Sequence, residues 1–343
     1  MPLPRLSPQQ MAGQRVIYSY NGLEPPARLL NLISHGEAAG VIFFGQNIAS
    51  PAQLTAVIAE LERADASPLN PVRAPLLLMT DQEGGVVRRM AGAPFQSARQ
   101  IGAAADPPGA AADAGSNGGR NLRGVGMNVN LAPVLDVYRQ PGDFDDQNQR
   151  SYSTDPAVVS QLGADFITAQ QRVGVAATAK HFPGLGAAET LQNTDKQPVT
   201  LDVPLATLRN TDEMPYKAAI AAGVRLVMVS WAAYPALDSR PAGLSPTIVD
   251  GELRQRLGFQ GVTITDALEA GALRGYGPIQ HRALLAAEAG MDLLLCSRRD
   301  VAEGQQATAG LQRGYLDGTL NKQAFTAAVQ RVVALRASLG HAP

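Results

Sequence analysis

The sequence predicts an α/β protein folded as one (β/α)8 barrel of the TIM type, with residues 1–343 in a single domain and its core at about 10–340. Three observations support this prediction. A glycine followed by a short apolar run occurs five times, helical patterns separate most of the apolar runs, and no linker or low-complexity tract divides the chain. Barrels of this class often reach this length as one domain.

The repeated pattern predicts five parallel strands. We expect each glycine to cap the helix before it, because a left-handed turn costs glycine nothing. Near-continuous apolar runs of this length are typical of strands buried on both faces. The five runs are Gly40-Val-Ile-Phe-Phe, Gly174-Val-Ala-Ala-Thr-Ala-Lys-His, Gly223-Val-Arg-Leu-Val-Met-Val-Ser, Gly261-Val-Thr-Ile-Thr-Asp and Gly290-Met-Asp-Leu-Leu-Leu-Cys.

Further apolar runs at Val16–Tyr20, Pro75–Asp81 and Met127–Asp136 bring the expected strands to eight. Helices are expected where a capping residue precedes a proline at the first helical position. Such starts lie at Ser50-Pro51, Asp155-Pro156 and Ser245-Pro246; another helix is expected after Asp212, and two amphipathic helices from about Val301 to Ala337.

A doubly wound sheet is the main alternative to the barrel. That fold usually carries a glycine-rich phosphate loop directly after its first strand. After Val16–Tyr20 the chain continues NGLEPPAR, which contains neither GxGxxG nor GxxxxGK[ST]. The barrel is therefore favoured.

Composition argues against several classes of partner. The formal net charge is −1, with 45% hydrophobic and 17% charged residues, so neither nucleic acid nor an anionic membrane is an expected partner. The four histidines have no metal-ligand spacing, and neither a metal nor a cofactor is predicted. We expect His35, His281 and His341 to be structural or solvated, and Cys296 to pack in the core.

The compartment and the oligomeric state stay open. No apolar stretch approaches the ~20 residues needed to span a bilayer. The first residues, MPLPRLSPQQMAGQR, lack the apolar core of a signal peptide. The protein therefore either stays inside the cell or has lost an export signal.

Polar residues end several of the predicted strands, where barrel enzymes carry their chemistry. They are Asp81 with Gln82 and Glu83, Asp136, Lys180 with His181, Ser230 with Trp231, and Asp266. The long loops at 137–155 and 182–202 belong to the same face, and long loops tend to be functional. Carboxylates, a cation and an imidazole without a phosphate or metal motif favour a polyhydroxylated substrate. Trp231 at the rim could stack on a sugar ring, whereas Asp136 either joins the site or caps the next loop.

Five motifs resemble the catalytic domain of glycoside hydrolase family 3, in its bacterial β-N-acetylglucosaminidase branch. They are DQEGGVVRRM (81–90), NLAPVLDV (130–137), RSYSTDP (150–156), KHFPGLG (180–186) and LSPTIVDGELRQRLGFQGVTITDALEAGA (244–272). They occur in the family's order, and the likeness covers about residues 10–340.

The resemblance implies a retaining exo-β-glycosidase that removes terminal β-linked N-acetylglucosamine from cell-wall muropeptides or chitin oligosaccharides. Asp266 stands at the position of the family's nucleophile, which forms a covalent glycosyl-enzyme. Asp81 matches the aspartate that holds sugar hydroxyls. The family's other contacts to that sugar are matched by Arg89, Arg150, Lys180 and His181.

The general acid departs from the family pattern. In this branch it is a histidine paired with an aspartate, in an Asp-Ser-His triplet on the loop after KHFPG. Here that position holds Asn193-Thr194-Asp195, and no histidine lies between His181 and His281. The HG pair that often follows KHFPG is replaced by Leu185-Gly186, and the aspartate that follows the nucleophile by Ala267.

Three explanations of this departure stay open. Asp195 or Glu189 serves as a carboxylic acid whose pKa is raised by burial or by a neighbouring charge. Alternatively, the enzyme is impaired and selective for good leaving groups, or the protein is a sugar binder without activity. An unrelated alternative is a barrel lyase or aldolase in which Lys180 forms a Schiff base.

Overall fold

The structure is a computed structural model that describes residues 4–340. Within these residues, eight parallel strands close into a barrel whose spatial order is the order of the chain. The strands are β1 (Val16–Tyr18), β2 (Gly40–Ile42), β3 (Leu77–Thr80), β6 (Val129–Asn130), β7 (Ala176–Phe182), β8 (Leu226–Val229), β11 (Val262–Ala267) and β12 (Leu293–Leu295). The predicted barrel is confirmed, because β1 pairs with both β2 and β12 and a doubly wound sheet would leave open edges.

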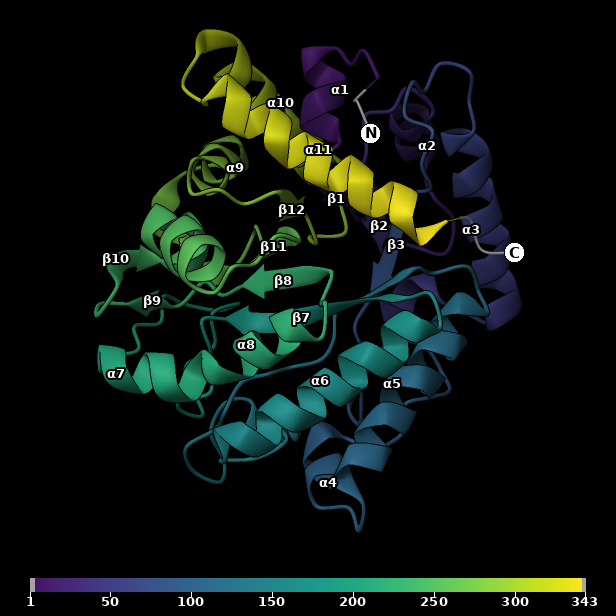
Figure 1. Cartoon of the computed structure of the whole chain (residues 1–343). Helices are drawn as coiled ribbons and strands as arrows, with labels where there is room; N and C mark the ends of the chain where they lie inside the picture. The colour runs from purple at the N-terminus through teal and green to yellow at the C-terminus, as the bar shows by residue number, and fades with distance from the viewer. Residues whose placement is uncertain (1–3, 341–343) are drawn as a thin grey trace.

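Helices surround the barrel, and α5 and α6 lie side by side on its outside (Figure 1). The longer ones are α2 (Ala27–Ser34), α3 (Pro51–Asp65), α5 (Pro107–Arg123), α6 (Pro156–Arg172), α8 (Met214–Ala221), the π-helix η5 (Thr247–Arg256), α9 (Ile279–Glu288), α10 (Val301–Asp317) and α11 (Lys322–Leu339). Shorter pieces are α1 (Pro8–Gly13), α4 (Ala98–Gly102), α7 (Leu205–Thr207), and the turns η1 (Gly45–Asn47), η2 (Asp146–Asn148), η3 (Leu208–Asp212), η4 (Ala242–Leu244) and η6 (Gly271–Tyr276). Small hairpins form from β4 (Gln82–Gly84) with β5 (Val87–Arg88), and from β9 (Ala233–Tyr234) with β10 (Asp238–Pro241).

The predicted helix starts agree with the side-chain caps. The Ser50 hydroxyl accepts the amide of Gln53, and the Asp155 carboxylate accepts the amide of Ala157. Ser245 accepts the amide of Ile248 at the start of η5. Asp212, however, gives no cap to α8, because its buried carboxylate pairs with Arg139 at 2.6 Å.

The repeated glycines serve two different purposes. Gly174, Gly223 and Gly290 have φ of 83°, 75° and 99°, the left-handed conformation expected of helix caps. Gly40 and Gly261 are not left-handed and correct that expectation. A Cβ at Gly40 would lie 2.0 Å from the Leu77 carbonyl oxygen, and one at Gly261 would lie 2.6 Å from the Arg225 carbonyl oxygen. Glycine is therefore required there by the close approach of the neighbouring backbone segment.

Helix α11 covers the amino-terminal end of the barrel and crosses β1 and β2 in Figure 1. Val332 and Leu335 pack against apolar side chains of the barrel strands. Arg336, fully buried, donates to the carbonyl oxygens of Ala74 and Pro75, which precede β3. The opposite end, where the strands finish, is left to the long loops.

The remaining sequence expectations concern single features. Cys296 is fully buried, His35 Nδ1 donates to the Asn31 carbonyl, and His281 is exposed. His341 lies outside the described residues. Within residues 4–340, no helix combines the length and apolar character required to cross a bilayer.

Candidate active site

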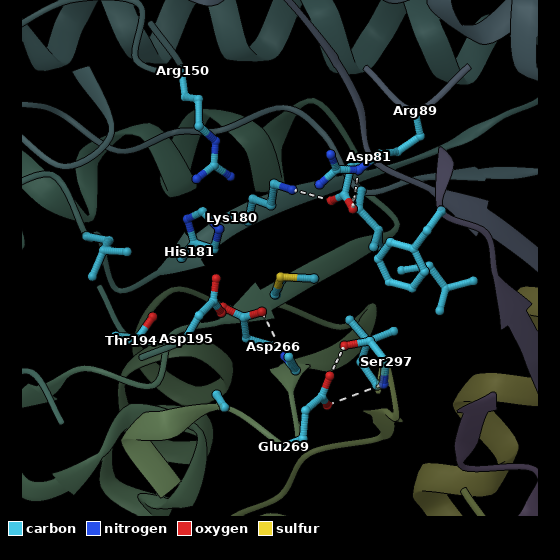
Figure 2. A pocket seen from close by; sticks show the side chains of 18 of the residues that line it. Asp81, Arg89, Arg150, Lys180, His181, Thr194, Asp195, Asp266, Glu269 and Ser297 are labelled. Carbon is cyan, nitrogen blue, oxygen red and sulfur yellow. Dashed lines mark hydrogen bonds and ion pairs between the residues drawn. The ribbon is translucent and has the colours of Figure 1, made fainter. Parts of the chain in front are cut away.

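A cavity of roughly 340 Å³ opens at the carboxyl ends of the strands (Figure 2). This volume is at the lower end of the range for small-molecule sites, about 300–1,000 Å³. The structure brings together seven of the residues singled out from the sequence: Asp81, Arg89, Arg150, Lys180, His181, Asp195 and Asp266. They come from the ends of four barrel strands, β3, β6, β7 and β11, and from the loops that follow them, as a barrel site requires.

Ion pairs with three carboxylates fix the two cations Lys180 and Arg150 on one side of the pocket. Lys180 Nζ lies 2.9 Å from Asp81 Oδ1 and 2.7 Å from Glu83 Oε1. Arg150 binds both oxygens of Glu83, at 2.8 and 2.9 Å, and reaches Asp145 at 3.1 Å. These cations hold the pKa of Glu83 well below its usual value despite its burial. Asp81 and Lys180 therefore present a fixed, charged pair to hydroxyl groups.

Lys180 is poorly suited to Schiff-base chemistry. Burial alone would lower its pKa, but the carboxylates of Asp81 and Glu83 outweigh this effect and raise it. A nucleophilic lysine needs the opposite shift, which leaves its amine unprotonated. The lyase or aldolase alternative therefore loses its catalytic residue.

His181 is held in one orientation by Asp136. Its Nδ1 lies 2.7 Å from Asp136 Oδ2, while Asp136 Oδ1 accepts the amides of Leu185 and His181 at 2.6 and 3.3 Å. Burial and the nearby Arg150 lower the pKa of His181 to about 4, so the ring is neutral near pH 7. Asp136 thus both anchors the following loop and orients His181, which combines the two roles considered for it.

Asp136 and Asp145 form a buried carboxyl pair. Both are almost completely inaccessible to solvent, and a ligand atom of each lies within 4.8 Å of the other and of His181. Burial and the charge of Asp136 raise the pKa of Asp145 to about 7, and burial also raises that of Asp136. Since two buried carboxylates this close cannot both ionise, we assign one shared proton to the pair.

These three residues are not arranged to receive a cation. Asp136 already accepts three N–H groups, and the Arg150 guanidinium occupies one side of Asp145. A positive guanidinium at 3.1 Å from a ligand oxygen opposes binding of a second positive charge. The shared proton satisfies the same oxygens at lower electrostatic cost.

Asp266 lies at the end of β11 and is supported from behind by Trp231. Its Oδ1 accepts the amide of Ala267 at 2.7 Å, and the Trp231 indole donates to the Ala267 carbonyl at 2.8 Å. Burial and the negative charge of Asp195 raise the pKa of Asp266, whereas His181 and Lys180 oppose this shift. Asp266 and Asp195 are therefore electrostatically coupled.

Asp195 lies beside Asp266 on the long loop after β7, and Figure 2 shows the two carboxyl groups directed toward each other. The loop is tied to η6 because Gly271 and Ala272 donate to the carbonyls of Asp195 and Thr194 at 2.8 and 3.0 Å. Desolvation of the carboxyl group by the surrounding atoms raises the pKa of Asp195; Arg150 opposes the shift and Glu269 adds to it. Asp195 itself keeps access to solvent at the mouth of the pocket.

Two residues singled out from the sequence lie elsewhere. Glu189 is exposed and does not line the pocket. The expectation that Trp231 stacks on a sugar at the rim is wrong. Its ring is fully buried against Gly243, so closely that a Cβ added to this glycine would lie 2.5 Å from the ring. Its indole N–H instead positions the segment that carries Asp266.

Sequence reasoning assigned no role to several participants. Glu83 and Asp145 carry the ionic network, Glu269 is held by the amide and hydroxyl of Ser297, and Phe144 and Arg299 line the pocket. Glu83 stood in the DQEGG motif beside Asp81, which was the available signal. Glu269 stood in the motif that carries Asp266, whereas Asp145, Phe144 and Arg299 lie on loops without a motif or periodic pattern that marks them.

Comparison with known proteins decides the family. Residues 10–335 match the model of the glycosyl hydrolase family 3 N-terminal domain. This chain belongs to glycosyl hydrolase family 3. The resemblance in its motifs is thereby confirmed, and the protein is a glycoside hydrolase.

The relatives span the chain almost completely. An uncharacterized secreted glycosyl hydrolase of Arthroderma benhamiae is 45% identical over 330 residues, which is 96% of this chain and 93% of the relative. A β-hexosaminidase of Xanthomonas campestris pv. campestris is 34% identical over 300 residues, which is 84% of this chain and 86% of the relative. The solved family 3 β-N-acetylglucosaminidase of Paenibacillus sp. superposes with a TM-score of 0.91 at 34% identity, over 98% of this chain; this chain spans only 63% of that longer protein.

Proposed function

We propose that this family 3 protein is a retaining exo-β-N-acetylglucosaminidase with Asp266 as nucleophile and Asp195 as general acid and base. The observation that carries the proposal is the coupled pair of carboxyl groups in one pocket. Because the negative charge of one carboxyl group raises the pKa of the other, the pair loses its protons in two steps, and between these steps one group is ionised and the other protonated, as a nucleophile and an acid require. Of the two carboxylic acids considered for the atypical loop, only Asp195 lines the pocket, so the proposal now excludes Glu189.

The pocket supplies the remaining parts of the reaction. Asp266 attacks the anomeric carbon while Asp195 protonates the departing oxygen, and Asp195 then removes a proton from the water that releases the sugar. Asp81, Lys180 and Arg89 hold hydroxyl groups on the opposite side of the ring. Neutral His181, oriented by Asp136, offers Nε2 to the same sugar.

The choice of N-acetylglucosamine rests on two further points. Similar proteins are named β-hexosaminidase and β-N-acetylglucosaminidase. The pocket lining also includes Met228, Ala267 and Ala270, whose apolar side chains suit the methyl group of an acetamido substituent. We extend the proposal to chitin oligosaccharides and cell-wall muropeptides as natural substrates.

Replacement of Asp195 separates acid catalysis from the rest of the reaction. We expect Asp195→Asn to lower kcat/KM for N,N′-diacetylchitobiose by about 10²–10⁴-fold, because general acid catalysis is typically worth that much. For an aryl N-acetylglucosaminide with an activated phenol the loss should be far smaller, since that leaving group departs unprotonated. Azide should rescue the second step in the variant and yield a glycosyl azide of retained configuration.

Glu189→Gln is the matched control, because Glu189 lies on the same loop but outside the pocket. We expect it to cleave both substrates like the unchanged protein. Equal losses on chitobiose in the two variants would remove Asp195 from the acid role. Cleavage of the aryl compound alone by the unchanged protein would favour an impaired enzyme, and binding without any cleavage would favour a sugar binder.

The nucleophile has a test of its own. A 2-fluoro sugar with a good leaving group should inactivate the enzyme with one covalent label. The fluorine slows both formation and breakdown of the glycosyl-enzyme, but the good leaving group keeps its formation fast, so the intermediate accumulates. Peptide mapping should place the label on Asp266, and Asp266→Asn should not be labelled. A label on Asp195 or Glu269 would refute the assignment.

A further inference from the structure

A second hollow of about 520 Å³ lies beside the catalytic pocket, between the two long loops. Its walls include Phe144, Asn148, Asn193 and Lys196. Phe144 lines both cavities, so they adjoin across its ring. The loops are fixed to each other, because Phe144 donates its amide to the Ala188 carbonyl at 2.9 Å and the Thr190 hydroxyl donates to the Gly142 carbonyl at 2.6 Å.

The position of the acid sets the direction in which the leaving group extends; this step rests on the proposed function. A general acid must contact the oxygen that it protonates, within about 2.6–3.2 Å. Figure 2 shows Thr194 and Asp195 on one side of the pocket and Asp81, Arg89 and Ser297 on the other. The part of the substrate beyond the cleaved bond therefore lies on the side of Asp195. Its chain neighbours Asn193 and Lys196 line the second hollow there.

The lining of the hollow has the chemistry of a sugar site. Gln147, Asn148, Asn193 and Gln197 supply amide groups that can exchange hydrogen bonds with hydroxyls, and Phe144 supplies an aromatic face for the sugar's C–H groups. Lys196 is the only charged residue in this lining, it is exposed, and it has no ion pair among residues 4–340.

We propose that this hollow is the leaving-group subsite, and that it takes a second sugar residue that is neutral or carries a carboxylate in preference to one that carries an amine. The Lys196 ammonium repels a cationic sugar and tolerates or attracts the other two. The enzyme would thus distinguish acetylated glycan from deacetylated glycan by the residue after the cleaved bond.

The experiment compares three substrates at a pH where a sugar amine is protonated: N,N′-diacetylchitobiose, the same disaccharide with a free amine on its reducing sugar, and an aryl N-acetylglucosaminide. We expect the unchanged protein to favour the acetylated disaccharide over the amine by about fivefold in kcat/KM, the size of one exposed like-charge contact. Lys196→Gln should bring this ratio close to one, and Lys196→Glu should invert it. Added salt should weaken the preference.

The controls separate charge from structure. Lys217→Gln removes an exposed lysine of α8 that does not line the hollow, and it should keep the original ratio. Turnover of the aryl compound should be the same in all variants, because a small phenol does not reach Lys196. An unchanged ratio in Lys196→Gln, or an equal loss on the aryl compound, would overturn the subsite.

Failure of the proposed function would give a different result. If the unchanged protein cleaves neither the aryl compound nor chitobiose, catalysis by Asp195 and Asp266 is refuted, and calorimetry then decides the subsite alone. Tighter binding of N,N′-diacetylchitobiose than of N-acetylglucosamine, with a preference that Lys196→Gln removes, supports it. Equal binding of the two sugars overturns it.

Discussion

Neighbouring residues decide which carboxyl groups of the pocket carry a charge. Glu83 is ionised because Arg150 and Lys180 contact it directly. Asp145 has only one such contact and faces Asp136, so it stays protonated over part of the physiological range. The same chemical group, a carboxyl, thus serves as a fixed anion in Glu83 and as a proton-sharing support for His181 in Asp145.

Asp145→Asn tests the shared proton through stability. The folded-state pKa of Asp145 is raised to about 7, so its contribution to stability is fully present below pH 4 and is lost as the pH rises through 7. Asparagine is neutral at every pH and can still donate to Asp136. We therefore expect the variant to gain about 1–3 kcal/mol relative to the unchanged protein between pH 5 and pH 8.

Urea unfolding at several pH values measures this difference. Asp113→Asn, at an exposed carboxylate of α5, is the control and should differ from the unchanged protein by the same small amount at every pH. A stability difference for Asp145→Asn that is flat from pH 5 to 8 would mean that Asp145 is ionised throughout. His181 acts in the opposite direction, because its pKa is lowered to about 4 and its contribution is lost as the pH falls below 6.5.

At the scale of elements, the junction between the acid loop and η6 controls the geometry of the two carboxyl groups. Gly271 begins η6, and a Cβ on it would lie 2.2 Å from the Lys196 carbonyl carbon and oxygen. Backbone atoms at that distance must move, and they belong to the residue directly after Asp195. The loop that carries the proposed acid is therefore packed against the segment that follows the proposed nucleophile.

Gly271→Ala should displace the acid without removing it. We expect kcat/KM for N,N′-diacetylchitobiose to fall about 10–100-fold, within the range that a misplacement of ~1 Å produces, and turnover of the activated aryl compound to fall much less. Gly275→Ala in the same turn is the matched control, since nothing lies within 4 Å of its added Cβ. Equal losses on both substrates would indicate a general disturbance of the pocket rather than a displaced acid.

The elements that the sequence predicted well are those with a local cause. Apolar runs and capped prolines predicted the eight strands and the starts of α3 and α6, because burial and capping act within a few residues. The purpose of Gly40 escaped prediction, since it depends on the Leu77 carbonyl of the next strand. Trp231 escaped for the same reason: only the fold brings Gly243 against its ring and buries it.

In the candidate site, too, the residues that could be predicted are those marked by a local sequence pattern. Strand-end residues such as Asp81 and Asp266 were identifiable because motifs mark them. Phe144, which lines the pocket, and Asp145, which pairs with Arg150 behind it, come instead from a long loop without a periodic pattern. The choice between Asp195 and Glu189 could not be made from the chain, because both lie on one loop six residues apart. Contacts with η6, some 75 residues later, decide which one faces the pocket.

At the scale of the whole molecule, the two ends of the barrel have separate tasks. The carboxyl end holds the pocket and the polar network, and the amino end is closed by α11 with buried apolar and ionic contacts. Loops at the first end can therefore change without loss of the core. This division predicts that damage at the amino end lowers stability but leaves the chemistry unchanged.

Arg336→Ala tests this division at the fully buried arginine of α11. Its guanidinium donates to the carbonyls of Ala74 and Pro75 at 2.7 and 2.9 Å and pairs with Asp65 at 3.2 Å. Removal leaves these acceptors buried without that donor, so we expect a loss of about 3–5 kcal/mol in the free energy of unfolding. Unfolding in guanidinium chloride measures this loss. Arg313→Ala, on the exposed face of α10, is the control, and its free energy of unfolding should change by less than about 0.5 kcal/mol. Below its unfolding transition, Arg336→Ala should keep kcat/KM for the aryl substrate within about twofold, and a large loss of activity in the fully folded variant would show that the two ends are coupled.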